Sequence, residues 1–258
     1  MIRRPHTLSE KVEAELLYQI LYGKFRTEKQ LPPETEIAKH LGVSRNVVRN
    51  GMSVLEQEGF ISRSRGVGTI VNKHVLEIQT RMDIADKFEN IIESAGCAAG
   101  CSYFDFDTDI QSDEIAELLE ISQDSKLYRI TRVMTADDVP AVFCQDYVPA
   151  SLIDKLDEEK NSQASKISTY EMLLQNENPE VYLAVADVSA VNPSEMICDL
   201  CDISSTTPVL HIQAVHYSFR GQPLLLSSEY YVNKLIKQTM VRKKIYSPDE
   251  ISRGYVYV

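Results

Sequence analysis

The chain has 258 residues, 43% of them hydrophobic, and a formal net charge of −11, so one large or two ordinary domains with apolar cores are expected. No run of eighteen apolar residues occurs, and the opening stretch MIRRPHTLSEKVEAE lacks the apolar core of a signal peptide. These features exclude a transmembrane helix and predict a cytoplasmic protein.

A helix is predicted at the start of the chain. Thr7 and Glu10 have the spacing of a capping box, in which each residue's side chain bonds the other's backbone N–H. Val12, Leu16 and Ile20 then recur every four residues, which predicts one buried face. Gly23 ends the helix, and we expect it to pack on the elements that follow.

Two further helices joined by a tight turn are predicted within residues 31–71, LPPETEIAKHLGVSRNVVRNGMSVLEQEGFISRSRGVGTIV. The first begins at Pro33, whose fixed φ suits a helix start. The turn follows at 41–43, and Ser44 is a good N-cap for the second helix. Apolar residues at helical spacing predict the buried stripe of that second helix: Val47, Val48, Met52 and Leu55.

A hairpin is predicted after the second helix. Gly59 ends the helix, residues 60–61 and 69–71 have the composition of short strands, and Arg65-Gly66-Val67-Gly68 turns between them. Helix, turn, helix and hairpin in this order predict a winged helix-turn-helix, a module that places its second helix in a DNA groove.

The start of that second helix carries the expected DNA chemistry. Ser44, Arg45, Asn46 and Arg49 lie in its first two turns, where such helices contact bases and phosphates. Arginine can bond guanine and asparagine can bond adenine, each through two hydrogen bonds, and serine with free backbone N–H groups suits a phosphate. The alternative is a capped amphipathic helix with a solvated charged face.

This segment resembles the DNA-binding domain of the GntR family of bacterial transcription regulators. The resemblance rests on LPPETEI, GVSRNVVR, LEQEGFI and the glycine hairpin, which are similar to the family's LPSEREL, GVSRTTVR, LEEEGLI and glycine wing. It implies DNA contacts from the wing residues Arg65 and Gly66. Thr35 stands where the family has a DNA-contacting arginine, and Asn46 stands where it has threonine, so the preferred bases are expected to differ.

Charge divides the chain into two parts. Residues 1–74 carry 12 Lys and Arg against 8 Asp and Glu, whereas the remainder carries 15 against 30. A basic part can displace counterions from phosphates, and an acidic part avoids DNA. We therefore predict a winged helix-turn-helix domain at 1–74, a linker at 75–80 and a second domain at 81–258.

The second domain is predicted to be α+β with an antiparallel meander. Helices are expected at 84–94, after the N-cap Ser112, and at 169–175. Strands are expected in five segments: 126–134, 141–147, 181–191, 209–218 and 224–232.

This order resembles the UTRA effector-binding domain of the HutC subgroup, whose fold is similar to chorismate lyase. The segments that carry the resemblance are LYRITRVMTADDVPAVFCQDYVP, Ser168 to Tyr170, and TPVLHIQAVHYSFRGQPLLLSSEYY. It implies a pocket for a small effector, an anion in many members. The residues that it places there are Arg132, Arg129, Cys144, Ser168, Tyr170 and Tyr231.

The expected pocket departs from the family's pattern. Met134 replaces a second arginine, and Cys144 and Leu225 replace acids that bind hydroxyls. Because a buried polar group without a partner costs about 1–3 kcal/mol, we expect a ligand less polar than a sugar phosphate, with an anion still allowed. Arg132 either contacts that ligand or forms a structural salt bridge.

The cysteines suggest no cofactor. Cys97 and Cys101, and Cys198 and Cys201, form two close pairs about a hundred residues apart, which is a poor match to zinc sites. Neither histidines nor acids cluster around them, so we expect small buried side chains and no metal. A thiol- or metal-based sensor on the same scaffold is the alternative.

The expected function is a ligand-responsive transcription regulator, in the commoner mode a repressor. As a homodimer it would bind a palindromic double-stranded DNA operator, and a small metabolite would change the spacing of its two DNA-binding domains. An enzyme with a chorismate-lyase-like fold is the other alternative. The chain has no GxSxG, HExxH or phosphate-loop motif, and His211 and His216 should point to opposite faces of one strand.

Overall fold

The computed structural model describes residues 7–84, 86–153, 167–176, 178–232 and 235–242. The chain divides into two compact units. Met1–Asp83 together with Thr239–Val258 form the first, and Ile84–Gln238 form the second. The predicted division into 1–74, 75–80 and 81–258 did not include the return of the chain to the first unit.

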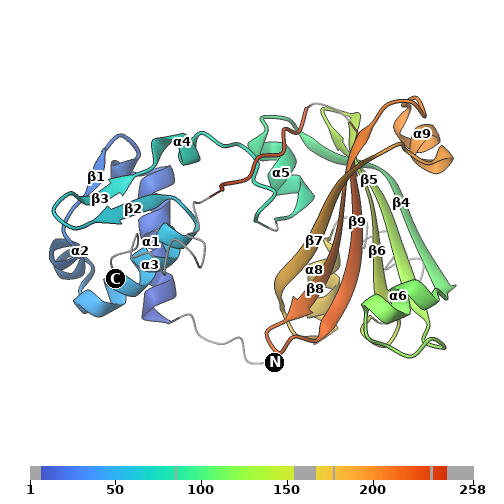
Figure 1. Cartoon of the computed structure of the whole chain (residues 1–258), viewed down its shortest axis with the longest axis horizontal. Coiled ribbons are helices and arrows are strands. Elements are labelled where there is room, and N and C mark those ends of the chain that lie inside the picture. Colours follow the sequence, from blue (N-terminus) through green and yellow to red (C-terminus); the bar gives the residue numbers. More distant parts are fainter. Residues whose placement is uncertain (1–6, 85, 154–166, 177, 233–234, 243–258) are drawn as a thin grey trace, which may run out of the picture. The chain divides into compact units, whose positions relative to one another are not determined.

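The first unit consists of helices on a small sheet with strand order β1-β3-β2 (Figure 1). Its elements, in chain order, are α1 (Leu8–Leu21), η1 (Lys24–Arg26), β1 (Gln30–Leu31), α2 (Glu34–Leu41), α3 (Arg45–Gln57), β2 (Ile61–Ser64), β3 (Gly68–Val71) and α4 (Lys73–Leu76). This is the predicted winged helix-turn-helix, in which α3 is the second helix and the β2–β3 hairpin is the wing.

Local capping chemistry sets the helix ends. Thr7 and Glu10 form both bonds of the predicted capping box, and the Ser44 side chain accepts the backbone N–H of Val47. Gly42 ends α2 with a φ of 66°, a left-handed conformation that glycine adopts without cost. The turn between α2 and α3 is therefore tight.

A glycine in the middle of α3 lets α1 approach closely. The predicted stripes of the two helices meet in the core, where Val12, Leu16, Val48, Met52 and Leu55 are all buried. A Cβ on Gly51 would lie 3.1 Å from two backbone atoms of α1, Glu13 N and Ser9 O. Glycine within a helix costs about 1 kcal/mol relative to alanine, and the close packing explains why it is present.

Residues 75–80, where a linker was expected, pack on the first unit. Val75 of α4 and Thr80 are buried, and Ile78 contacts the core. Arg81 donates to the Glu58 carbonyl and pairs with Thr239 in a parallel bridge, while Val241 also packs on the core. The polar composition of this segment suggested a linker, but its apolar side chains hold it against the core of the first unit.

The second unit is built on one antiparallel sheet with strand order β4-β5-β6-β9-β8-β7. Its elements are α5 (Phe88–Ser94), β4 (Ala99–Ile110), α6 (Asp113–Leu118), β5 (Leu127–Ala136), β6 (Val139–Pro149), α8 (Thr169–Gln175), β7 (Val181–Val191), α9 (Glu195–Cys201), β8 (Val209–Ser218) and β9 (Pro223–Tyr231). This confirms the predicted α+β class and the antiparallel sheet.

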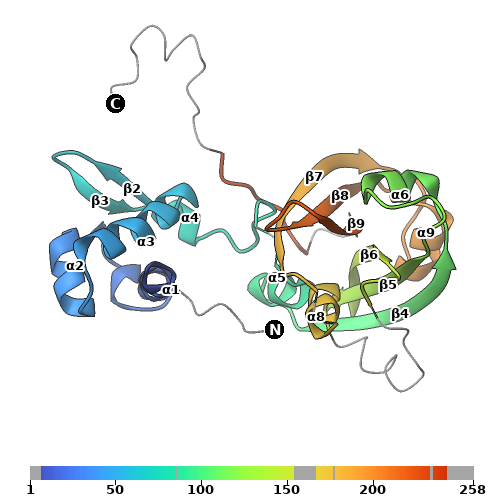
Figure 2. The same ribbon diagram turned by 90° about the horizontal axis from the view of Figure 1, so that it is seen from below.

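Helices cover both faces of the curved sheet, as the view from below shows (Figure 2). Ile130, Val148 and Leu225 pack against Met172 and Leu173 of α8 on one face. The other face packs on α9 through Ile197 and Cys201, and on α6 in a separate cluster around Leu119. Strand alternation therefore sends β5, β6 and β9 side chains to two different environments.

Strand β4 was not predicted from the sequence. It pairs along β5 with irregularities after Cys101 and after Asp107. Its Phe104 and Phe106 alternate with Asp105 and Asp107, and acids have low strand propensity. The β5–β6 hairpin was expected, and its two-residue turn places both Asp137 and Asp138 at positive φ.

The packing at Gly51 gives a test of the first unit. We expect Gly51→Leu to lower the free energy of unfolding by about 1–3 kcal/mol, the usual cost of overpacking, because backbone atoms of α1 cannot move aside. Urea unfolding followed by circular dichroism would measure it. Asn50→Leu adds the same side chain at the exposed neighbouring position and should cost much less; equal losses in both variants would refute the packing argument.

Candidate functional site

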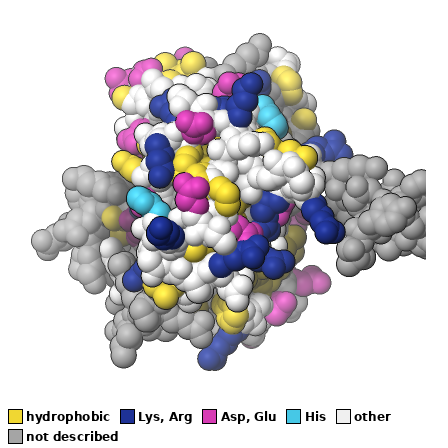
Figure 3. Space-filling view, turned by 90° about the vertical axis from the view of Figure 1, so that its left-hand side faces the viewer, with side chains coloured by type: hydrophobic (Ala, Val, Ile, Leu, Met, Phe, Trp, Pro, Cys, Tyr) yellow, Lys and Arg dark blue, Asp and Glu magenta, His cyan; other side chains and the backbone are white. Residues whose placement is uncertain are grey.

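The predicted DNA-binding residues are all exposed on the first unit. Thr35 lies on α2, while Ser44 and the three residues Arg45, Asn46 and Arg49 lie at the start of α3. Arg45 is 65% exposed and its Nε donates to the Glu34 carboxylate over 2.8 Å. That bond links the start of α3 to the start of α2. Figure 3 shows Lys and Arg side chains across this side of the molecule, with acidic ones among them.

Arg63, which sequence reasoning did not single out, ties the wing to α3. Its Nε donates to Glu56 over 2.8 Å, its Nη2 donates to the Ser53 hydroxyl over 2.9 Å, and its backbone N–H donates to Glu56 as well. Glu34 lies 3.8 Å from its Nη1. Strand β2 is thereby held against the C-terminal half of α3, and the wing keeps a fixed position beside that helix.

The tip of the wing is exposed and depends on glycine. Arg65, Gly66 and Val67 are all exposed, and Val67 presents 56% of its surface. Gly66 and Gly68 adopt φ values of 83° and 98°, which side chains with a Cβ rarely tolerate. The wing can therefore bring its backbone and Arg65 close to a partner.

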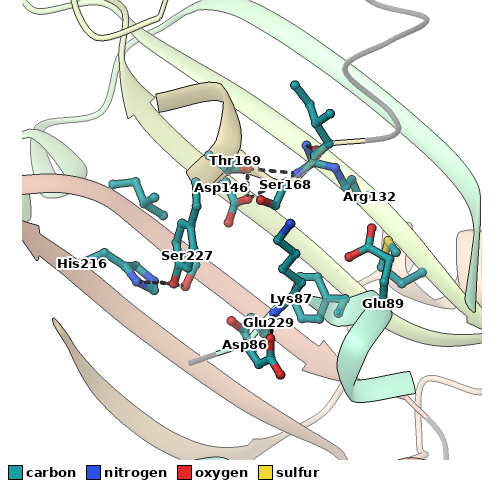
Figure 4. A pocket seen from close by; sticks show the side chains of 15 residues that line it. Asp86, Lys87, Glu89, Arg132, Asp146, Ser168, Thr169, His216, Ser227 and Glu229 are labelled. Carbon is teal, nitrogen blue, oxygen red and sulfur yellow. Dashed lines mark hydrogen bonds and ion pairs between the residues drawn. The ribbon is translucent and has the colours of Figure 1, made fainter. Parts of the chain in front are cut away.

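A cavity that is partly open to solvent lies in the second unit. It is bounded by one face of the sheet, the start of α8 and the residues around the start of α5 (Figure 4). Six charged side chains line it: Asp86, Lys87, Glu89, Arg132, Asp146 and Glu229. Its apolar and aromatic lining includes Phe88, Met134, Tyr170 and Leu225.

Arg132 and Asp146 form a buried ion pair at the floor of this pocket. The Arg132 Nη1 lies 3.4 Å from the Asp146 carboxylate and donates to Thr169 over 3.0 Å, and its Nη2 donates to the Ile167 carbonyl over 3.0 Å. The Thr169 hydroxyl donates to the same carboxylate. Burial raises the pKa of Asp146, and Arg132 and Thr169 oppose that rise. Arg132 therefore forms a structural salt bridge, which is one of the two roles expected from the sequence.

Glu171 caps the helix that borders the pocket. Its carboxylate accepts the backbone N–H of Ser168 over 2.9 Å and the Ser168 hydroxyl over 3.2 Å, and Lys87 donates to it over 2.6 Å. Those bonds to Lys87 and Ser168 lower the pKa of Glu171. The side chain of Lys87 thus reaches across the pocket from the start of α5 to the start of α8.

A neutral histidine forms one wall of the pocket. The His216 ring lies 2.8 Å from the Tyr170 hydroxyl through Nδ1 and 2.8 Å from the Ser227 hydroxyl through Nε2. Burial lowers the pKa of His216 to about 4 and raises the pKa of Tyr170 above its ordinary value. Both groups therefore stay uncharged near neutral pH and offer hydrogen bonds only.

Glu229 is the second carboxyl group deep in the pocket. It accepts a hydrogen bond of 2.9 Å from the Tyr231 hydroxyl. Burial raises the pKa of Glu229 from 4.5 to about 7, the Tyr231 bond lowers it, and the nearby Asp146 raises it. Its side chain keeps some exposed surface because it faces the cavity. Sequence reasoning missed this residue.

The structure brings some of the predicted effector residues together and not others. Arg132, Ser168 and Tyr170 line the cavity. Tyr231 lies behind Glu229, and Cys144 is fully buried beside Arg132 and Glu229 in the sheet. Arg129 points to the opposite face, where it pairs with Asp107, because it lies three positions before Arg132 and side chains alternate along a strand.

Burial disfavours the thiolate form of four of the five cysteines. All five are free, and burial raises the pKa of Cys97, Cys101, Cys144 and Cys201, the last to about 11. Since the thiolate is the reactive and metal-binding form, these shifts weigh against a thiol sensor. Within the described ranges, no group of three or more His, Cys, Asp or Glu is placed to hold a metal ion.

Two family models match this chain. Residues 8–71 match the bacterial regulatory proteins of the gntR family, and residues 94–237 match the UTRA domain. The matched segments correspond to the first unit and to most of the second. In the part of the chain that the structure describes, every helix is too short or too polar to cross a bilayer.

Known relatives agree with these matches. The HTH-type transcriptional repressor NagR of Bacillus subtilis is 26% identical over 84% of this chain and 87% of its own length. The HTH-type transcriptional regulator GgaR of Escherichia coli is 27% identical over 75% of this chain and 74% of its own. The crystal structure of the possible transcriptional regulator YydK from Bacillus subtilis, 18% identical, superposes with a TM-score of 0.69 over 93% of this chain and 100% of that one.

Glu229 should make stability depend on pH. Its folded pKa of about 7 exceeds the unfolded value of 4.5, so the folded state loses stability as the pH rises through that interval. We expect Glu229→Gln to remove this loss. At pH 8 the free energy of unfolding of the variant should exceed that of the wild type by about 1–3 kcal/mol. Urea unfolding at several pH values would measure the difference. The exposed Glu114→Gln is the control, and a difference that stays flat with pH would contradict the assignment.

Proposed function

This chain belongs to the gntR family of bacterial regulatory proteins and carries a UTRA domain, and we propose that it binds a palindromic operator as a homodimer and acts as a repressor under the control of a small metabolite. It is a transcription regulator and not an enzyme. The observation that carries the proposal is the exposed, N-capped start of α3 with its two arginines beside a glycine-tipped wing.

The geometry of the first unit supports operator binding. Arg45, Asn46 and Arg49 are exposed in the first turns of α3, where a groove-binding helix contacts bases. The Ser44 cap and the Arg63 network hold α3 and the wing in fixed positions. Operator DNA lies in the cytoplasm, which is where we place the protein.

An unusual edge strand supports the homodimer. Strand β7 ends the sheet, and Tyr182, Val185 and Val188 are 63%, 63% and 47% exposed. Exposed edges are normally protected by charge; β4, at the other edge, carries Asp105, Asp107 and Asp109, whereas Asp187 is the single charge on β7. A second copy presents the same apolar edge, so two β7 strands can pair around a two-fold axis.

The pocket in the second unit supports control by a metabolite. It is concave and lined by apolar, aromatic and hydrogen-bonding side chains, as small-molecule sites are. The relative NagR is named a transcriptional repressor, which favours repression relieved by ligand. Coupling requires that the ligand and the operator favour different arrangements of the dimer.

The DNA contacts can be tested by substitution. We expect Arg45→Ala and Arg49→Ala each to weaken binding by about 1–3 kcal/mol, the loss for one base-contacting arginine. Operator duplexes would be selected from a random library with the wild-type protein, and gel shifts would give the affinities. Arg220→Ala, an exposed arginine in the second unit, should bind like the wild type. Unchanged affinity in both α3 variants would exclude this helix from the groove.

The dimer can be tested at β7. We expect Val185→Asp to give monomers in light scattering, because it would place a carboxylate from each copy in an apolar interface. Val139→Asp introduces the same charge at a site that is 50% exposed in the β5–β6 hairpin and should leave the dimer intact. A Val185→Asp protein that remains dimeric would place the interface elsewhere.

A further inference from the structure

The groups in the pocket that could bind an anion are already engaged by carboxylates of the chain itself. Arg132 is paired with Asp146 and also bonded to Thr169 and Ile167. Lys87 and the start of α8 are bonded to Glu171. A ligand anion would have to displace Asp146, which is buried, or Glu171, which would then lose its capping bonds.

Glu229 differs from these two acids. Its hydrogen-bond partner is the neutral Tyr231 hydroxyl, and the nearby like charge of Asp146 raises its pKa. Strand β9 presents Glu229 to the cavity on the same face as Leu225 and Ser227. Figure 4 shows the Glu229 side chain among the residues that line the cavity.

The lining as a whole has an excess of acid. Asp86, Glu89, Asp146 and Glu229 outnumber Lys87 and Arg132. The rings of Phe88 and Tyr170 also border the cavity. A carboxylate beside aromatic rings is the combination that recognises organic cations, because the carboxylate bonds their N–H groups and the ring faces attract their charge.

We propose that the effector carries a protonated nitrogen group, an ammonium, amidinium or guanidinium, that binds Glu229. The inference rests on the proposed function only in taking this pocket to be the effector site. The cation would convert Glu229 to its ionised form and supply an opposite charge, where the partner among the described residues is the neutral Tyr231 hydroxyl. Ser227, His216 and Tyr170 would then bind the neutral polar part of the ligand, and Met134 and Leu225 its apolar part.

Matched probes separate charge from shape. Methylguanidine and methylurea have nearly the same shape but differ in charge, and so do acetamidine and acetamide. Calorimetry at constant ionic strength would compare these four probes and inorganic phosphate on the wild-type chain. We expect each cation to bind more tightly than its neutral counterpart and phosphate not to bind at this site.

Substitution assigns the preference to one residue. Glu229→Gln should weaken binding of the cations by about tenfold or more, the loss expected for one hydrogen bond to a charged group, and leave the neutral probes unchanged. Glu229→Asp keeps the charge and should retain the preference. Glu114→Gln, exposed on α6, is the control. Cations that bind no better than their neutral counterparts, or equally well to wild type and Glu229→Gln, would overturn the proposal.

A separate measurement tests the proposed function. Gel shifts with duplexes selected from a random library require no pocket ligand. If no duplex is bound, the operator proposal fails while the charge preference measured by calorimetry stands. If duplexes are bound and the cations show no dependence on Glu229, the inference about the ligand fails and the regulator remains.

Discussion

The buried ion pair of Arg132 and Asp146 determines what the pocket can bind. Two charges removed from water are stable only when they satisfy each other and their remaining hydrogen bonds, and removal of one partner typically costs about 3–5 kcal/mol. Here the Ile167 carbonyl and the Thr169 hydroxyl complete the set. The pair fixes β5 and β6 to the start of α8, so the floor of the cavity is rigid and its one buried arginine is already neutralised.

Once that arginine is neutralised, the remaining charges decide selectivity. The neutral His216 and the capped start of α8 contribute hydrogen bonds without net charge. Glu229 is then a buried carboxyl group whose ionisation burial opposes and whose hydrogen-bond partner is a neutral hydroxyl. Because the cost of ionising a buried carboxyl is removed by a bound cation, affinity and ligand charge are linked through this one side chain. Glu229→Gln should therefore weaken the binding of a cation and raise the free energy of unfolding.

Much of the first unit could be predicted from the sequence because its signals are local. The capping box at Thr7, the cap at Ser44 and the apolar stripes are read from residues within two helical turns. Strand β4 could not, because its acids disfavour strands and its pairing with β5 is long-range. The pocket was only partly predictable: Arg132 and Ser168 follow from a family resemblance, but only the fold brings Lys87 to Glu171 and Asp146 near Glu229.

The path of the chain links the pocket to the DNA-binding unit twice. The chain passes from the first unit to the second after Asp83 and returns after Gln238. The connection after Asp83 precedes Asp86 and Lys87, which line the pocket. The connection after Gln238 follows β9, the strand that carries Glu229. In the first unit the two passages are joined, because Arg81 pairs with Thr239. The proposed control by a ligand therefore has two covalent routes to the DNA-binding unit, one after Asp83 and one before Thr239.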